Sequence, residues 1–307
     1  MEKIITFKNF TKKFKANQIG PISFDIKRGS ITALLGGSGS GKTVVLNALT
    51  GIIKKYKGEI ILKKSNRRSR KSYLENKSMG YYTQMDFSLY DISAYNFLYD
   101  SCKIFGLAKN KIKEKIEYWL TFFELWDKKD KKLKNFSWGM KNRMNFIICF
   151  IKEPDIIILD EPGANLDSIW RNKIKNLLIK FKNEGKTIVV TVHNIDELAE
   201  LFDDYIILES GAIIFKGSKK ELDLYNKFKI FFSVKVDIKK FRDFMNSKKI
   251  KTFKYDPLEN SIVFASNSAE EINWVFLFLL KESVPIKNLI KLSISMESIY
   301  KALEKNE

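Results

Sequence analysis

A segment near the N-terminus has residue types and a spacing that suit phosphate binding. It matches G-x-x-x-x-G-K-[ST] at every fixed position and comprises Gly36, Gly37, Ser38, Gly39, Ser40, Gly41, Lys42 and Thr43. Glycines let backbone N–H groups close around phosphate oxygens, and a following helix adds its positive dipole end. Lys42 would reach the β- and γ-phosphates, and the Thr43 hydroxyl would bind Mg²⁺. The segment predicts a nucleotide phosphate site without choosing among kinases, GTPases, helicases and transport ATPases.

Two carboxylates end an apolar run further along the chain. Residues 156–159 are all aliphatic, and Asp160 and Glu161 follow them. At the C-terminal end of a strand, Asp160 is placed to hold Mg²⁺ or its water, and Glu161 to act as general base toward a water that attacks the γ-phosphate. The alternative is a pair of solvated acids at a strand end. The accompanying phosphate loop favours the catalytic interpretation.

The pattern of apolar residues predicts the elements that hold these side chains. A strand at 31–35 leads into the phosphate loop, and a helix at 44–49 follows it. A helical region is expected at 91–151, where aromatic and aliphatic residues recur every three or four positions. Further strands are expected at 4–7, 22–26, 59–62, 156–160, 187–192 and 205–208, with a helix at 169–183. The later strands predict a buried parallel sheet, and hence an α/β protein.

A third motif, Phe136-Ser137-Trp138-Gly139-Met140, lies before the carboxylate strand. With this motif in place the sequence resembles the ATP-binding-cassette (ABC) ATPases, in particular cassettes of bacitracin- and daunorubicin-type exporters. The resemblance implies that Ser137 and Gly139 bind the γ-phosphate held by the phosphate loop of another protomer. Trp138 and Met140 depart from the usual signature. Taken alone, the motif is equally typical of a helix start with Ser137 as N-cap.

Three further positions match the family in order. The resemblance implies that Gln84 joins Mg²⁺ and the attacking water to the helical region, and that His193 contacts the γ-phosphate. The segment 165–167 (Asn-Leu-Asp) resembles the loop that crosses the dimer interface of cassettes. The aromatic residue that stacks on adenine corresponds to Phe14, with Phe10 as the rival. The resemblance covers about residues 1–220.

The resemblance also implies partners and a mechanism. The chain is expected to bind ATP and Mg²⁺ and to hydrolyse ATP at the interface of a head-to-tail dimer. One chain carries one phosphate loop and one signature motif, so a second ATP-binding subunit, identical or similar, is required. Transport requires separate membrane-spanning permease subunits, which would place the chain in the cytoplasm, peripheral on the inner face of the cell membrane. Aromatic residues of the helical region either line the groove for the permease or pack that region internally: Tyr90, Tyr95, Phe97, Tyr99 and Phe105.

The predicted architecture has two domains. Residues 1–225 form a P-loop NTPase ABC cassette, with a mixed central sheet, antiparallel N-terminal strands and a helical subdomain at about 91–151. Residues 228–307 form a small α+β, ferredoxin-like accessory domain with the order β-α-β-β-α-β. Its expected elements are 231–236, 238–247, 251–255, 261–265, 269–281 and 286–294, and a last helix is expected at 296–303. The tail at 293–303 resembles the end of exporter cassettes that carry a C-terminal domain.

Composition narrows the class of protein. The net charge is +19, with 55 Lys and Arg against 36 Asp and Glu, but only seven of the basic residues are arginines. Because recognition of nucleic acid favours arginine and the lysines are scattered, no nucleic-acid partner is expected. The cluster at 67–71 (RRSRK) is interpreted as a solvated loop tip.

No apolar run reaches the ~20 residues of a membrane span, and two cysteines make no disulfide framework.

Two other functions remain open. One is an ABC ATPase that acts on a cytosolic macromolecular complex, such as DNA, ribosomes or Fe–S assembly machinery. Ser137 lies only 94 positions after Thr43, which leaves no room for a long coiled-coil insertion. The other is a degenerate cassette that binds ATP as a regulatory module, against which intact Lys42, Asp160, Glu161 and His193 argue.

Overall fold

The chain consists of two compact units in the computed structural model, residues 1–219 and 220–307. The structure describes residues 2–163, 166–192, 198, 200–219, 221, 226–248, 250, 253–266 and 269–292. The strand β11 (Asn226–Phe232) is the first strand of the second unit in the described part of the chain.

The first unit contains a six-stranded sheet in its described part, with the order β10-β9-β3-β8-β7-β6. From β9 to β6 all neighbours are parallel, and β10 pairs antiparallel with β9. The strands are β3 (Ile31–Gly36), β6 (Met79–Tyr82), β7 (Ile156–Asp160), β8 (Thr187–Val192), β9 (Asp204–Glu209) and β10 (Ala212–Ser218). β3, β7 and β8 are buried along almost their whole length and are mostly apolar, as expected for central parallel strands.

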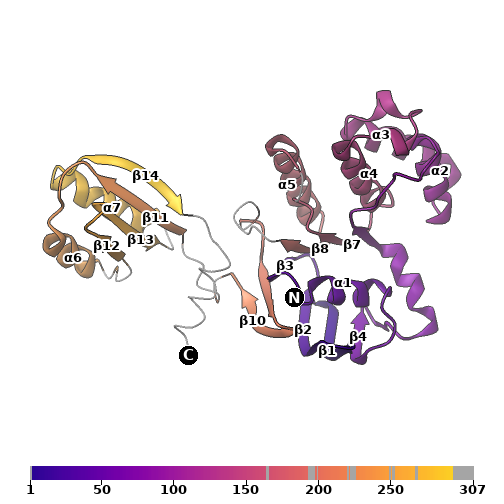
Figure 1. The fold of residues 1–307 in the computed structure, drawn as a ribbon, viewed down its shortest axis with the longest axis horizontal. Helices are drawn as coiled ribbons and strands as arrows, with labels where there is room; N and C mark the ends of the chain where they lie inside the picture. Colours follow the sequence, from indigo (N-terminus) through magenta and orange to yellow (C-terminus); the bar gives the residue numbers. More distant parts are fainter. Residues whose placement is uncertain are drawn as a thin grey trace. The chain divides into compact units, whose positions relative to one another are not determined.

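A second sheet of the same unit is antiparallel, with the order β2-β1-β4-β5. Its strands are β1 (Lys3–Lys13), β2 (Gln18–Lys27), β4 (Lys57–Leu62) and β5 (Ser65–Asn66). Apolar residues of this sheet, of helix α1 (Lys42–Thr50) and of the parallel strands form one core. The core therefore fixes α1, which starts at the phosphate loop, against both sheets (Figure 1).

The expected helical region contains α2 (Ala94–Ile104), α3 (Lys109–Phe122) and α4 (Trp138–Phe150), grouped beside the parallel sheet (Figure 1). Its five singled-out aromatics are all half-buried. Tyr90 and Phe97 pack edge-on around buried Phe87, and Tyr95 stacks on Tyr99. These side chains thus pack the region and still present part of their surface to solvent. Helix α5 (Ser168–Asn183) connects β7 to β8.

The second unit has the order β11-α6-β12-β13-α7-β14, with sheet order β12-β13-β11-β14 and antiparallel neighbours throughout. This is the predicted ferredoxin-like pattern. Its other elements are α6 (Ile238–Ser247), β12 (Phe253–Asp256), β13 (Ser261–Ser266), α7 (Ala269–Lys281) and β14 (Ile286–Leu292). The strand predicted at 231–236 is wrong in position, because β11 ends at Phe232. The helix predicted at 296–303 lies outside the described residues.

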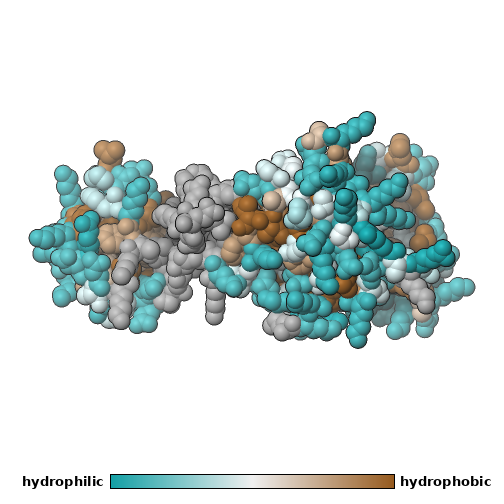
Figure 2. All heavy atoms as spheres, turned by 90° about the horizontal axis from the view of Figure 1, so that it is seen from below, coloured by the Kyte–Doolittle hydropathy of each residue, from teal (hydrophilic) through white to brown (hydrophobic). Residues whose placement is uncertain are grey.

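Hydrophilic side chains cover most of the surface visible in Figure 2, with smaller hydrophobic areas between them. In the part of the chain that the structure describes, no helix is long and apolar enough to cross a membrane.

Candidate nucleotide site

The phosphate loop joins the end of β3 to the start of α1. Gly41, directly before the helix, has φ 108°, and a Cβ there would lie 2.7 Å from Ile19 Cδ1. At Gly36 a Cβ would lie 2.4 Å from the backbone oxygen of Leu208. Both positions therefore need glycine for physical reasons: a left-handed backbone at one, close packing against β9 at the other. Gly37 and Gly39 border open space, which leaves their backbone accessible to a ligand.

Lys42 lies inside this loop. Its Nζ donates to the backbone oxygens of Gly36 at 2.8 Å and Gly37 at 3.1 Å, and the residue is only 5% exposed. Burial lowers the pKa of Lys42, while the charges of Glu161 and Asp160 act in the opposite direction. The backbone of the loop thus holds the ammonium group of Lys42, which interacts electrostatically with the two predicted catalytic carboxylates, Asp160 and Glu161.

Asp160 is bonded from two sides. Thr43 Oγ1 donates to Asp160 Oδ2 at 3.4 Å, and Thr191 Oγ1 donates to Asp160 Oδ1 at 2.7 Å. Thr191 is fully buried on β8, opposite Asp160 in the parallel register. Thr191 belongs to none of the sequence motifs. The available signal was a polar residue inside the otherwise apolar end of the run at 187–192.

A cavity of about 340 Å³ lies at the phosphate loop. Lys42, Thr43 and Glu161 line it, together with Phe14 from the end of β1. Phe14 is 47% exposed, whereas its rival Phe10 is fully buried in the core. The ring of Phe14 is therefore the one that a planar base in this cavity can reach.

The polar groups at the loop are also suited to binding a triphosphate and Mg²⁺. Ser40 Oγ is buried and has no hydrogen-bond partner among the described atoms, which is the state of a donor that a phosphate oxygen can satisfy. Thr43 and Asp160 supply two hard oxygen ligands suited to Mg²⁺. No group of three or more His, Cys, Asp or Glu that could hold a metal ion occurs in the described ranges. Phosphate oxygens and water would have to supply the remaining ligands.

The other predicted site residues lie apart from this cavity. Ser137 is the N-cap of α4, and its Oγ accepts from the backbone N–H of Met140 at 3.3 Å. Gly139 is exposed, and a Cβ there would meet no atom within 4 Å. Gln84 lines a small recess with Trp138 at the start of α4 and does not line the cavity.

The interface loop and the histidine are only partly described. Asp167 N-caps α5 by accepting from the backbone N–H of Trp170 at 2.8 Å. Asn165 and His193 lie outside the described residues.

Comparison with known proteins identifies the family. The sequence profile described as ABC transporter matches residues 19–164. An uncharacterised ABC transporter ATP-binding protein of Methanocaldococcus jannaschii is 31% identical over 224 residues, which is 72% of this chain and 80% of that protein. The chain belongs to the ABC transporter ATP-binding proteins. An energy-coupling factor transporter ATP-binding protein of Clostridium perfringens is 32% identical over 205 residues, 66% of this chain and 72% of that protein.

Solved structures show the same cassette fold. One is a cbiO1 protein of Clostridium perfringens, described as part of the ABC transporter complex cbiONQ, with a TM-score of 0.62 and 28% identity over 72% of this chain and 91% of that one. Another is a dimeric cassette bound to ADP and phosphate, with a TM-score of 0.61 and 23% identity over 70% of this chain and 98% of that one. The predicted P-loop cassette fold is confirmed.

Family membership shows the activity: the cassette binds ATP and hydrolyses it. It is an ATP-binding subunit of an ABC transporter. These similarities are to ATP-binding proteins of ABC transporters in general and do not test the exporter subtype predicted from the signature motif.

Proposed function

We propose that the cassette is the ATP-hydrolysing subunit of an ABC exporter and works as a head-to-tail dimer against membrane-spanning permease subunits. One observation carries the dimer: Lys42 and Glu161 line the cavity, whereas Ser137 lies exposed at the start of α4 and outside it. A second copy, or a similar subunit, brings a signature motif to each phosphate loop. Each composite site then has donors on both sides of the γ-phosphate.

Within each site we infer the following roles. Thr43 and Asp160 hold Mg²⁺, Glu161 is the general base, and Phe14 stacks on adenine. Gln84 and His193 connect the γ-phosphate to the helical region and to the opposite protomer. When bound, Mg²⁺ neutralises charge on the triphosphate. The positions of Lys42, Asp160 and Thr43 around one loop support these roles.

Dimer formation is tested with Glu161→Gln, which should retain ATP, so that light scattering finds a dimer in MgATP and a monomer without it. Adding Gly139→Asp should keep ATP bound and return the protein to a monomer, since the new carboxylate faces the partner's γ-phosphate. Because a side chain at position 139 would extend into open space, loss of the dimer in this variant would not be caused by misfolding. Thr121→Asp, exposed on α3 of the same region, is the charge-matched control and should leave the dimer intact. Equal behaviour of Gly139→Asp and Thr121→Asp contradicts the composite site.

Export is supported by the resemblance of residues 136–143 to exporter cassettes and by the ferredoxin-like second unit. Import is the second candidate, because the related protein of Clostridium perfringens is named for an energy-coupling factor transporter. The direction of transport can be determined by measuring small molecules inside cells that produce either the wild type or Glu161→Gln. A compound that accumulates with the inactive variant indicates export, and a compound that is depleted indicates import.

We infer a peripheral position on the inner face of the membrane, with the permease in contact with the helical region near Tyr90 and Tyr95. The partly exposed rings of these residues are suitable interface anchors. A tagged protein solubilised from membranes should retain a protein with membrane spans, and Tyr95→Ser should release it while leaving the isolated cassette folded. Recovery with a soluble macromolecular complex instead would favour the non-transport alternative.

A further inference from the structure

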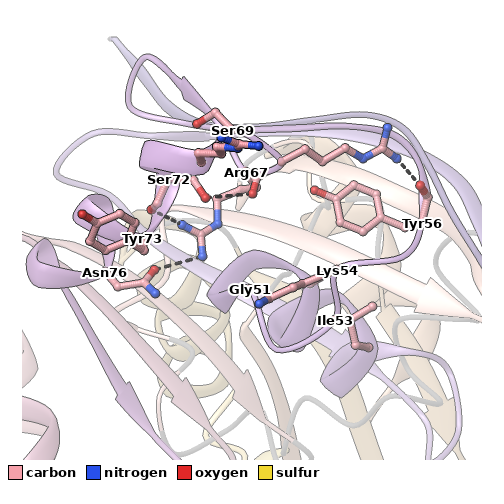
Figure 3. A pocket seen from close by; sticks show the side chains of 12 residues that line it. Gly51, Ile53, Lys54, Tyr56, Arg67, Ser69, Ser72, Tyr73 and Asn76 are labelled. Carbon is pink, nitrogen blue, oxygen red and sulfur yellow. Dashed lines mark hydrogen bonds between the residues drawn. The ribbon is translucent and has the colours of Figure 1, made fainter.

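A second pocket, of about 540 Å³, lies beside the C-terminal end of α1. Twelve residues line it, from the end of α1, the loop that follows, the segment after β5, and the 3-10 helix η1 (Arg70–Ser78) (Figure 3). The phosphate loop lies at the opposite end of α1, and at ~1.5 Å per residue the helix is roughly 13 Å long. The pocket is therefore distinct from the nucleotide site.

The pocket concentrates arginine in a chain that otherwise uses lysine. Three of the seven arginines, Arg67, Arg68 and Arg70, line it together with Lys54. None of the twelve described residues that line it is acidic. The interpretation of residues 67–71 as a solvated loop tip is wrong for Arg67, which is only 8% exposed.

Arg67 is a buried cation with an unused donor. Its Nη1 donates to Ser72 O at 2.8 Å and its Nη2 to Asn76 Oδ1 at 2.9 Å, and both bonds are visible in Figure 3. Its Nε is buried and has no hydrogen-bond partner among the described atoms. Burial lowers the pKa of Arg67, opposed by Tyr56 and Glu75. Gly51 allows this position, because a Cβ there would lie 2.6 Å from Nη2.

The two neighbouring arginines are not needed for that packing. Arg68 lies 4.5 Å from the ring centroid of Tyr56 and donates to the Tyr56 backbone oxygen. Arg70 is exposed at the start of η1. A structural role in tying η1 to the end of β5 therefore explains Arg67, and the contacts with Tyr56 hold Arg68 in place. Neither role explains why Arg70 and Lys54 also line the pocket.

We propose that this pocket binds a phosphate-bearing anion through Arg68 and Arg70, with Arg67 adding its buried charge and its free Nε donor. Planar guanidinium groups match phosphate oxygens in pairs, which a lysine cannot do. The phosphate can belong to a soluble ligand or to a lipid headgroup. Tyr73, which is 63% exposed, and the half-buried Ile53 both line the pocket and offer apolar surface to the rest of such a ligand. The site does not depend on the proposed export function.

Calorimetric titration with inorganic pyrophosphate tests the proposal. The nucleotide site is first saturated with MgADP, and free Mg²⁺ is kept constant. The double variant Arg68→Gln/Arg70→Gln should lower pyrophosphate affinity at least about tenfold, since it removes charged hydrogen bonds. The control Lys109→Gln/Lys111→Gln removes the same charge from exposed positions on α3 and should leave the affinity unchanged. Thermal unfolding of both variants verifies that they are folded.

A second arm identifies the source of the phosphate. Wild type and both variants are sedimented with vesicles of phosphatidylcholine alone or mixed with phosphatidylglycerol. Loss of binding to anionic vesicles only in the arginine variant, with competition by pyrophosphate, assigns a headgroup. Arginine-dependent binding of pyrophosphate without vesicle binding assigns a soluble anion. Equal losses in the two double variants, or no binding of either probe by the wild type, overturn the proposal.

Discussion

The hydroxyl of Thr191 donates a 2.7 Å hydrogen bond to Asp160 Oδ1. The same hydroxyl accepts a 2.8 Å bond from the backbone N–H of Glu161, whose φ of 53° lies in the left-handed region that non-glycine residues rarely adopt. A single buried side chain of β8 thus orients the carboxylate of Asp160 and holds the backbone of Glu161. This arrangement defines Thr191 as a positioning residue for both acids.

Thr191→Val should lower ATP turnover about tenfold, because it removes a hydrogen bond to a charged group without changing the side-chain volume much. The affinity for ATP should change less, since Lys42 and the glycines of the loop remain. Steady-state kinetics that separate kcat from KM provide the measurement. Thr32→Val is the control, as Thr32 is equally buried on β3 and pairs only weakly, at 3.4 Å, with Ser30. Equal losses in both variants would mean that buried threonines serve packing alone.

Lys42→Ala should lower ATP affinity by more than about tenfold, because the triphosphate loses a cation in a desolvated loop. Titration with a fluorescent ATP analogue measures this. Lys57→Ala, an exposed position on β4, is the control for a lost positive charge and should bind normally. Wild-type affinity in Lys42→Ala would refute the nucleotide assignment of the loop.

Glu161→Gln should bind ATP and lose turnover, since an amide cannot accept a proton from the attacking water while Asp160 is unchanged. Single-turnover measurements of phosphate release separate this from a binding defect. Glu209→Gln serves for comparison, because Glu209 also ends a strand of the same sheet but is exposed and lies outside the cavity. Near-normal release by Glu161→Gln would remove Glu161 from the role of base.

The free energy of unfolding should fall as the pH rises from 10 toward 12. Burial, and next the charge of Asp160, raise the pKa of Tyr81 from 10.0 to about 12. In that interval the unfolded chain loses the tyrosine proton while the folded chain keeps it, so the stabilisation present below pH 10 is lost. Tyr81→Phe should lose less stability than the wild type between about pH 10 and about pH 12 in urea unfolding. Tyr118→Phe, exposed on α3, should behave as the wild type does.

The sequence by itself determined those features that depend only on residues close together in the chain. The spacing of residues 36–43 predicts a phosphate loop because each backbone donor is placed by its own segment. The apolar run before Asp160 predicts β7 with its bounds, Ile156–Asp160, because a fully buried strand must be apolar throughout. The order of α6 and the flanking strands follows from local periodicity in the same way.

Only the tertiary structure decided which distant side chains meet. Thr191 lies opposite Asp160 because of the register between β7 and β8, which no local pattern specifies. Phe14 reaches the cavity and Phe10 does not, because the sheet buries one ring and leaves the other at its end. Arg67 became a buried cation because the segment after β5 packs against the glycine that ends α1. Such contacts depend on packing between elements far apart in the chain, and residue types alone do not encode them.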